Sequence, residues 1–147
     1  MGLERLLSVT DISASGMSAE RFRMEVVANN VANAYSTRTA EGGPYRRQNV
    51  VFASAYKDAI GSNSRSPDRL RGVQVVSVEQ DQSDLPIIYQ PGHPDADESG
   101  YVTMPNVKPA SEMVDLITAS RAYEANLRVL RSFRDMAEQA LSLLRGT

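Results

Sequence analysis

The chain has 147 residues and a formal net charge of −2, with an isoelectric point near 5.4. This near balance argues against a general nucleic-acid-binding surface, which carries a positive domain charge. The chain contains no Cys, which excludes disulfides, thiol nucleophiles and Cys-based metal sites. We expect no transmembrane segment, because no apolar run approaches about 18 residues. We also expect no cleavable signal peptide, because residues 1–10 hold Glu4 and Arg5 and no long apolar run.

The prolines divide the chain, because all seven lie between Pro44 and Pro109. We therefore predict a mainly α fold with a small β insertion. A helix in residues 1–34 and a helix in residues 109–147 would pack as a coiled-coil pair and form one discontinuous helical assembly domain. A β-rich, loop-rich region at residues 35–108 would lie between them in sequence.

The N-terminal segment has an apolar spacing of three and four residues, seen at Ile12, Gly16, Ala19, Phe22 and Val26. The pattern is weak, because Gly and several Ser residues lower helix propensity. Propensity alone rarely stabilises such a helix, so it would depend on partners.

Three Asn residues, Asn29, Asn30 and Asn33, end this segment. Asn tolerates the left-handed conformation at a helix C-terminus, so a helix end there is the simplest interpretation. One cap does not need three Asn residues. We therefore expect some of these amides to face a partner.

The central region changes to short alternating runs bounded by turn residues. Such runs predict strands that pair as a small antiparallel sheet or as hairpins, marginal unless packed on something. The expected strands lie within 44–52, 72–79, 85–89 and 100–104, with a polar loop at 55–71 and a turn at 91–97.

Residues 110–144 read as one long amphipathic helix. Its apolar stripe repeats about every 3.5 residues, which is typical of a helix packed on another helix. At about 1.5 Å per residue the helix would be roughly 50 Å long, too long for the remaining chain to cover. The helix therefore needs partners. The stripe comprises Met113, Leu116, Ser120, Tyr123, Leu127, Leu130, Arg134, Ala137, Leu141 and Leu144.

Two residues with polar groups, Tyr123 in this stripe and Asn126 beside it, have two interpretations. Tyr123 can be simple core. Alternatively, the Tyr123 hydroxyl and the Asn126 amide can fix the register of one assembly geometry, at some cost in stability.

The candidate reactive groups do not form a site. His93 is the only His, and its spacing from Asp95, Asp97 and Glu98 fits neither a zinc helix nor a calcium loop. A rigid turn formed with the neighbouring prolines is favoured over a metal site. No G-x-S-x-G elbow occurs, so we expect no catalysis, no metal and no cofactor.

The basic residues do not indicate a binding site. The arginines at 46–47 and 65–71 have acidic residues nearby in sequence, so we interpret them as solvated surface and expect no nucleic-acid partner.

Seven motifs carry a resemblance to a known family. The sequences D-I-S-A-S-G-M (11–17) and V-A-N-N-V-A-N-A (27–34) resemble the N-terminal signature of bacterial flagellar rod and hook proteins. E-M-V-D-L-I (112–117) and S-R-A-Y-E-A-N (120–126) resemble the matching C-terminal signature. The central motifs at 38–48, 91–96 and 100–106 resemble those of proximal rod proteins. Residues 55–71 match nothing in the family pattern.

This resemblance implies a structural protein rather than an enzyme. Such proteins are exported through the flagellar type III apparatus without a cleaved signal peptide. They then assemble helically into the rod of the basal body, the drive-shaft that crosses the periplasm, transmits torque and forms part of the export channel. The partners implied are other rod proteins, further copies of the chain and the surrounding membrane ring.

We expect the assembly interface to lie on the two terminal helices, whose ends would become ordered when they join their neighbours. The alternative function is a soluble coiled-coil adaptor or secretion chaperone with stable helical ends. A hydrolase built around His93 is a more distant alternative. The expected interface residues are Phe22, Val26, Asn29, Asn30, Asn33, Tyr123, Glu124, Asn126, Leu127 and Leu130.

Overall fold

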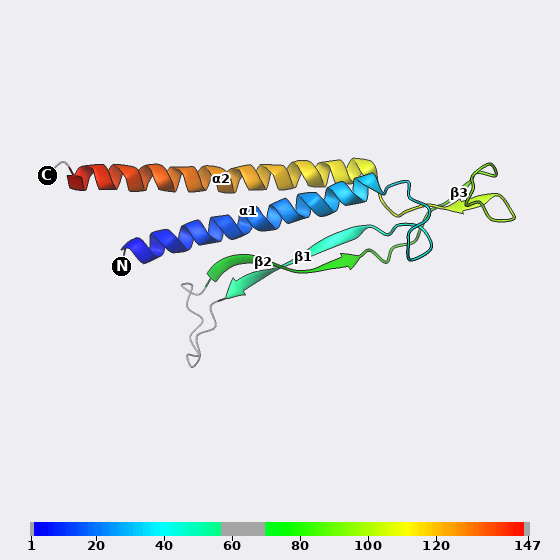
Figure 1. Cartoon of the computed structure of the whole chain (residues 1–147), viewed down its shortest axis with the longest axis horizontal. Coiled ribbons are helices and arrows are strands. Elements are labelled where there is room, and N and C mark those ends of the chain that lie inside the picture. The colour runs from blue at the N-terminus through cyan, green and yellow to red at the C-terminus, as the bar shows by residue number, and fades with distance from the viewer. Residues whose placement is uncertain (1, 57–69, 146–147) are drawn as a thin grey trace, which may run out of the picture. The chain divides into compact units, whose positions relative to one another are not determined.

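The computed structural model describes residues 2–56 and 70–145. It confirms a mainly α fold, with two long helices and small antiparallel sheets between them in sequence (Figure 1). No helix in the described part of the chain is both long enough and apolar enough to cross a membrane. The elements in order are α1 (Gly2–Ala32), β1 (Gln48–Tyr56), β2 (Leu70–Gln80), β3 (Ile87–Tyr89), β4 (Tyr101–Thr103) and α2 (Pro109–Arg145).

The chain divides into two compact units. Unit 1 comprises residues 1–22, 52–76 and 119–147, and unit 2 comprises residues 23–51 and 77–118. Each unit therefore contains part of both helices and part of the β1–β2 pair.

The strands form two separate two-stranded sheets, β1–β2 and β3–β4. In the second sheet Ile88 lies opposite Val102 and Tyr89 lies opposite Tyr101. β3 and β4 are shorter than we predicted, because Pro86 and Pro105 lie near their ends and lack the N–H that a longer ladder needs.

The predicted loop at 55–71 is too long, because β1 extends to Tyr56 and β2 begins at Leu70. The strand residues inside the predicted loop are Ala55, Tyr56, Leu70 and Arg71, most of which are apolar, so the strands continue further than the polar sequence between them suggested. The remainder of that predicted loop lies outside the described residues.

α1 ends where the Asn residues predicted, but not by the mechanism we expected. No described residue other than Gly has a positive φ, so no Asn adopts the left-handed conformation. Instead, Asn33 Nδ2 donates a hydrogen bond to the backbone oxygen of Asn29 at 3.0 Å. The Ser36 hydroxyl in turn donates to Asn33 Oδ1 at 3.1 Å. The same Asn29 carbonyl also accepts the backbone N–H of Asn33 at 3.0 Å, so Asn33 donates to it from both its backbone and its side chain.

α2 begins at Pro109 as predicted, since Pro is favoured in the first turn of a helix. The predicted stripe is half right. Leu116, Tyr123 and Leu130 are half-buried, but Met113 and Leu141 are exposed. The alternate inward positions are one residue earlier than predicted, at 112, 119, 126 and 133. Glu112 and Ala119 there are both 0% exposed. We missed Glu112 and Asn126 because hydrophobic periodicity does not select polar residues, and we missed Ala119 and Phe133 because the stripe was started one residue late, at Met113.

Candidate functional site

The centre of unit 2 is the side chain of Asn30, which is fully buried. Its Nδ2 donates to the backbone oxygen of Gln48 and to Glu112 Oε2, both at 2.9 Å. Its Oδ1 accepts hydrogen bonds from the Tyr45 hydroxyl and from the Gln48 backbone N–H, also at 2.9 Å. The amide therefore uses both donors and both acceptor positions. It joins the end of α1 to the start of β1 and to the first turn of α2.

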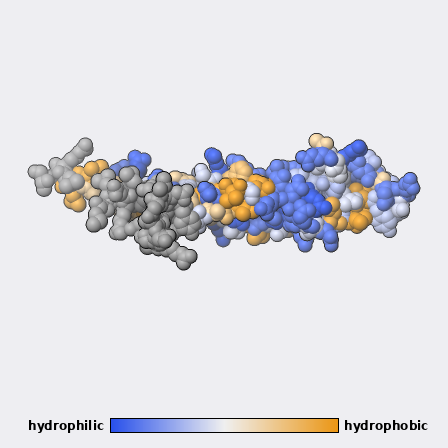
Figure 2. Space-filling model, turned by 90° about the horizontal axis from the view of Figure 1, so that it is seen from below, coloured by the Kyte–Doolittle hydropathy of each residue, from blue (hydrophilic) through white to orange (hydrophobic). Residues whose placement is uncertain are grey.

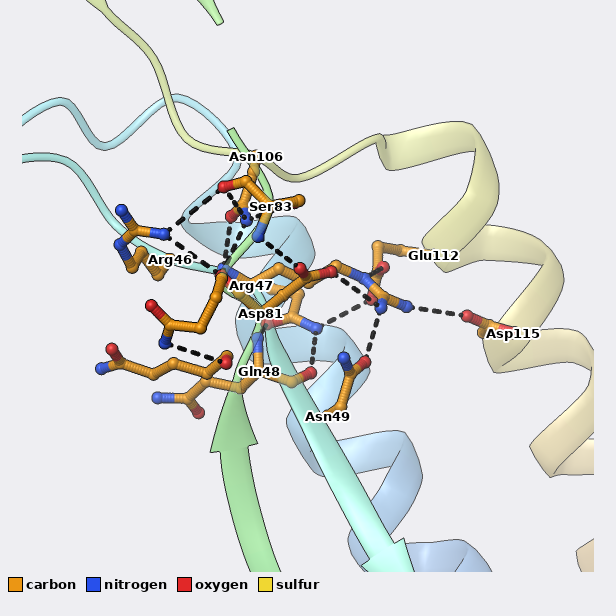
Figure 3. Close-up of polar contacts among 12 residues, drawn as sticks. Arg46, Arg47, Gln48, Asn49, Asp81, Ser83, Asn106, Glu112 and Asp115 are labelled. Atoms are coloured by element: carbon orange, nitrogen blue, oxygen red, sulfur yellow. Dashed lines mark hydrogen bonds and ion pairs between the residues drawn. The ribbon is translucent and has the colours of Figure 1, made fainter. Parts of the chain in front are cut away.

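The second carboxylate oxygen of Glu112 is bound by Arg47, which precedes β1 (Figure 3). Arg47 Nε donates to Glu112 Oε1 at 2.5 Å, and its Nη2 donates to Asp115 Oδ2 at 3.2 Å. The fork also donates from Nη1 to Asn49 Oδ1 and lies 3.8 Å from Asp81 Oδ2. A planar guanidinium is suited to several fixed acceptors at once. The buried carboxylate thus has a cation and an amide as partners, as burial of a charge requires.

Two loops are held to this cluster through Asn106. Its Oδ1 accepts the backbone N–H of Arg47 at 2.7 Å, while its Nδ2 donates to the backbone oxygen of Asp81 at 3.0 Å. Asn106 Nδ2 also donates to Ser83 Oγ at 2.9 Å. We call the group formed by Asn30, Tyr45, Arg47, Gln48, Asn49, Asp81, Asn106, Glu112 and Asp115 the polar clamp.

Two groups of the polar clamp have shifted pKa values. Burial raises the pKa of the Tyr45 hydroxyl, and the negative charge of Glu112 raises it further. Hydrogen bonds from Ser83 lower the pKa of Asp81, and the positive charges of Arg47 and Arg46 act in the same direction. Tyr45 is therefore held neutral as a donor, while Asp81 is held ionised as an acceptor.

The sequence-based interpretation of Arg46 and Arg47 as solvated surface is wrong for Arg47, whose side chain is 23% exposed and fully engaged. Arg46 is tied more loosely, by Nη1 bonds of 3.3 and 3.4 Å to the backbone oxygens of Asp81 and Ser83. An ionic residue at an inward position of α2 was the available signal, since Glu112 lies four residues before Leu116. Amphipathic scoring treats such a residue as a break rather than as a contact.

The residues around His93 form a turn, as we predicted. His93 Nδ1 accepts the backbone N–H of Asp95 at 3.1 Å, and the Thr37 hydroxyl donates to Asp95 Oδ2 at 2.8 Å. Within the described ranges no three His, Cys, Asp or Glu side chains are grouped so that they could hold a metal ion.

In unit 1 the two helices approach each other closely at Gly16. A Cβ atom added there would lie 3.0 Å from Asn126 Nδ2. Next to it, Ser15 Oγ accepts the backbone N–H of Val73 at 3.1 Å, which holds β2 on α1. Beside these contacts is a cavity of about 210 Å³, lined by Ile12, Gly16, Ala19, Glu20, Phe52, Val73 and Asn126.

The structure separates the expected interface residues into three groups by their exposure. Asn30 and Val26 are buried within the chain. They cannot contact a neighbouring subunit directly and can affect assembly only by fixing the positions of other residues. Asn29 and Glu124 are exposed, and Phe22 is 36% exposed. Half-buried are Asn33, Tyr123, Asn126, Leu127 and Leu130.

Other apolar side chains are also exposed. Figure 2 shows orange apolar patches set among polar surface on the face that it draws. On α2, Met113, Val114 and Ile117 are 56%, 63% and 53% exposed and share one face by their spacing. On β3 and β4, the exposed side chains are Ile87, Ile88, Tyr89 and Tyr101.

Comparison with known proteins agrees with this architecture at both ends of the chain. Residues 11–37 match the family described as flagella basal body rod protein. Residues 98–143 match the family described as flagellar basal body rod FlgEFG protein C-terminal. These two regions contain the contacting halves of the polar clamp on α1 and α2.

Curated relatives match over nearly the full chain. The flagellar basal-body rod protein FlgC of Borreliella burgdorferi is 43% identical, covering 96% of this chain and 99% of the relative. That of Salmonella typhimurium is 41% identical, covering 94% and 97%. That of Bacillus subtilis is 39% identical, covering 90% and 94%. The chain therefore belongs to the FlgC family of flagellar basal-body rod proteins and is a structural subunit of that rod.

Proposed function

We propose that this subunit polymerises helically into the part of the rod that crosses the periplasm, where it transmits torque and contributes to the wall of the export channel. The proposal builds on the rod family, whose members share nearly the whole chain. Contacts between unlike surfaces that do not close into a ring generate such helical polymers.

One observation carries the proposal: the chain leaves Met113, Val114 and Ile117 uncovered on one face of α2. On another face of the same turns, Glu112 is buried and hydrogen-bonded within the chain, and Leu116 is half-buried. Contiguous exposed apolar side chains mark interaction sites in soluble proteins. In a polymer, neighbouring subunits would supply the missing burial.

The polar clamp has a supporting role in this proposal. Torque acting on a subunit tends to shear elements past one another. Asn30 and Arg47 connect α1, β1 and α2 through directional bonds, and directional bonds tolerate less sliding than apolar contacts do. A clamp of this kind would make unit 2 a stiff element of the shaft.

The two terminal helices, at 1–34 and 109–147, would act together as the helical assembly domain. Within it, the exposed or half-buried members of the expected interface would contact neighbouring subunits. The subunit would reach its place through the flagellar type III apparatus without losing a signal peptide. Its neighbours would be copies of itself, other rod proteins and the membrane ring.

The decisive experiment expresses the Ile117→Ser variant in cells from which the parent gene has been deleted. We expect the variant protein to be made and exported but to support few completed rods, because a polar side chain weakens the apolar contact. Ala125→Ser, an exposed change on the same helix, is the matched control and should support normal swimming. Hook–basal bodies purified from the parent strain must contain the chain. Its absence from them would refute the proposed function.

A further inference from the structure

We propose that the exposed face of the β3–β4 sheet docks on the outer face of α2 in a neighbouring copy of this chain, with Arg121 of that copy entering the groove beside Tyr101. The inference rests on the proposed function, and it names the two surfaces that would join successive subunits.

The register of β3 and β4 sorts their side chains onto two faces. Residues directly opposite each other share a face, so Tyr89 and Tyr101 lie on the same side as Ile87. Their exposed fractions are 62%, 46% and 66%. The other side carries Val102, which is 1% exposed, and Ile88, which is 43% exposed, so that side is partly packed within the chain. The side with Ile87, Tyr89 and Tyr101 is the open apolar face of the sheet.

The open face is rigid. The rings of Tyr89 and Tyr101 meet edge to face, with centroids 5.2 Å apart at 62°. The ring of Tyr89 also lies over Gly100, where an added Cβ would come within 2.9 Å of it. Aromatic side chains that are already ordered lose little entropy on binding, which is why they are frequent anchors of protein interfaces.

A groove of about 490 Å³ runs beside this face, with Tyr101 on one wall and the carboxylates of Asp95 and Asp97 also lining it. Asp97 Oδ1 accepts the backbone N–H groups of Ser99 and Tyr101, both at 2.8 Å, so the carboxylate is fixed in place. Carboxylates next to an aromatic ring are the chemistry that binds a guanidinium group.

The groove remains acidic after its internal pairing is counted. Arg38 lies 3.8 Å from Asp95 and offsets that charge in part. The charged side chains that line the groove are Asp95, Asp97 and Arg38, so one negative charge remains. An occupant with a positive charge beside apolar side chains therefore fits this lining.

The outer face of α2 has this composition. Arg121 is exposed and lies one turn after Ile117, on the face that also carries Met113 and Val114. Arg128 and Arg134 pair with Glu124 and Glu138 on the same helix, at 3.8 and 2.8 Å. Among the ion pairs of the described residues, Arg121 takes part in none. Its guanidinium is thus available to a neighbour.

The two surfaces are complementary: their charges are opposite in sign, and both carry exposed apolar side chains. The apolar trio of α2 would cover the open sheet face, while Arg121 would lie between Asp97 and the Tyr101 ring. Because the two surfaces differ, each copy would offer one and receive the other. Such a contact repeats without closing, as a rod requires.

Disulfide trapping tests the contact directly, because the natural chain contains no Cys. Thr103→Cys lies at the sheet face and groove, and Arg121→Cys lies on the helix. We expect the chain with both changes to form a ladder of linked copies in purified hook–basal bodies under mild oxidation. The matched control combines Thr103→Cys with Gln139→Cys, an exposed position farther along α2, and should give monomers.

Charge reversal provides a second measurement. Arg121→Glu should abolish swimming, Arg121→Lys should retain part of it, and Arg131→Glu should swim like the parent. Far-UV circular dichroism of the purified Arg121→Glu chain checks that it still folds. The inference fails if the Thr103–Arg121 cysteine pair stays monomeric in hook–basal bodies that contain the chain, or if Arg121→Glu swims normally. Absence of the parent chain from those particles would instead refute the proposed function.

Discussion

The side chains of Asn30 and Glu112, which are 82 residues apart in sequence, are hydrogen-bonded at 2.9 Å and are both 0% exposed. Glu112 is therefore a buried acid held by an amide on one oxygen and by Arg47 on the other. Removing either partner leaves a buried charge that water cannot reach. The contact that joins the two helices in unit 2 is thus polar, and it is specific for these side chains.

Asn30→Asp should destabilise unit 2 strongly. The change replaces an N–H donor with a carboxylate oxygen that faces Glu112, so we expect a loss of about 3–5 kcal/mol in unfolding free energy at neutral pH. Two adjacent carboxylates raise the pKa of one of them. The penalty should therefore be full above that raised pKa and should shrink as the pH falls below it, when one acid can donate. Urea unfolding at several pH values measures this.

Asn33→Asp is the control for that measurement, since the bonds of the Asn33 amide go to Asn29 and Ser36, both nearby in sequence. In cells, Asn30→Asp should be exported but should assemble poorly. Normal swimming together with parent-like unfolding would contradict the assigned contact.

Arg47→Met and Arg46→Met separate a buried cation from a peripheral one in adjacent residues. Loss of Arg47 leaves Glu112 without its charge partner, and breaking a buried pair in this way costs about 3–5 kcal/mol. Loss of Arg46 removes only long bonds to backbone oxygens and should cost less than about 1 kcal/mol. Thermal unfolding of the two variants compares them. Equal losses would show that Arg47 contributes no more to the free energy of unfolding than Arg46 does.

Tyr45 should make the protein sensitive to alkaline pH. Its pKa is raised from 10.0 in the folded chain by burial and by Glu112. The unfolded chain therefore ionises first as the pH increases. This contribution to stability is fully present below about pH 10 and is lost as the pH rises through the folded pKa. Tyr45→Phe should cost about 0.5–1.5 kcal/mol at neutral pH and should flatten the alkaline decline. An equally steep decline in that variant would exclude Tyr45 as its source.

Gly72→Ala should loosen β2 from α1 in unit 1. Gly72 has a φ of 104°, and an added Cβ would clash with Ser15 Oγ, which accepts the Val73 N–H. Gly42→Ala is the control, because its φ of 89° causes similar backbone strain but nothing lies within 4 Å. We expect about 1–2 kcal/mol from strain in the control and a clearly larger loss at Gly72. Hydrogen exchange at the Val73 amide should increase only in Gly72→Ala, and equal protection in both variants would count against the contact.

The helical ends should be incompletely ordered in the dilute, free subunit. The C-terminal part of α2 presents Met136, Leu141 and Leu143 at 51%, 59% and 76% exposure, so few contacts stabilise it there. Far-UV circular dichroism of the full chain, compared with a chain lacking residues 1–34 and 110–147, measures the helix content of the ends. A signal matching both complete helices in the monomer would favour the adaptor alternative over a rod subunit.

The extent of the helices was readable from the sequence, because their signals are local. Pro109 begins α2, the Asn group ends α1, and the change from helical to alternating spacing marks the strands. Family motifs at both ends also carried the rod assignment, which the curated relatives confirm. The resemblance added what periodicity could not, since long helices with missing partners fit an adaptor as well as a rod.

The tertiary structure decided which residues face one another. Hydrophobic periodicity selected Met113 for the inward face, whereas the structure places Glu112 there and exposes Met113. Whether a charged side chain is tolerated in a core depends on the donors that surround it, and Asn30 and Arg47 come from distant parts of the chain. A local pattern contains no information about such partners. The sequence by itself therefore determined the elements and the family, and folding determined the polar clamp that joins the elements of unit 2.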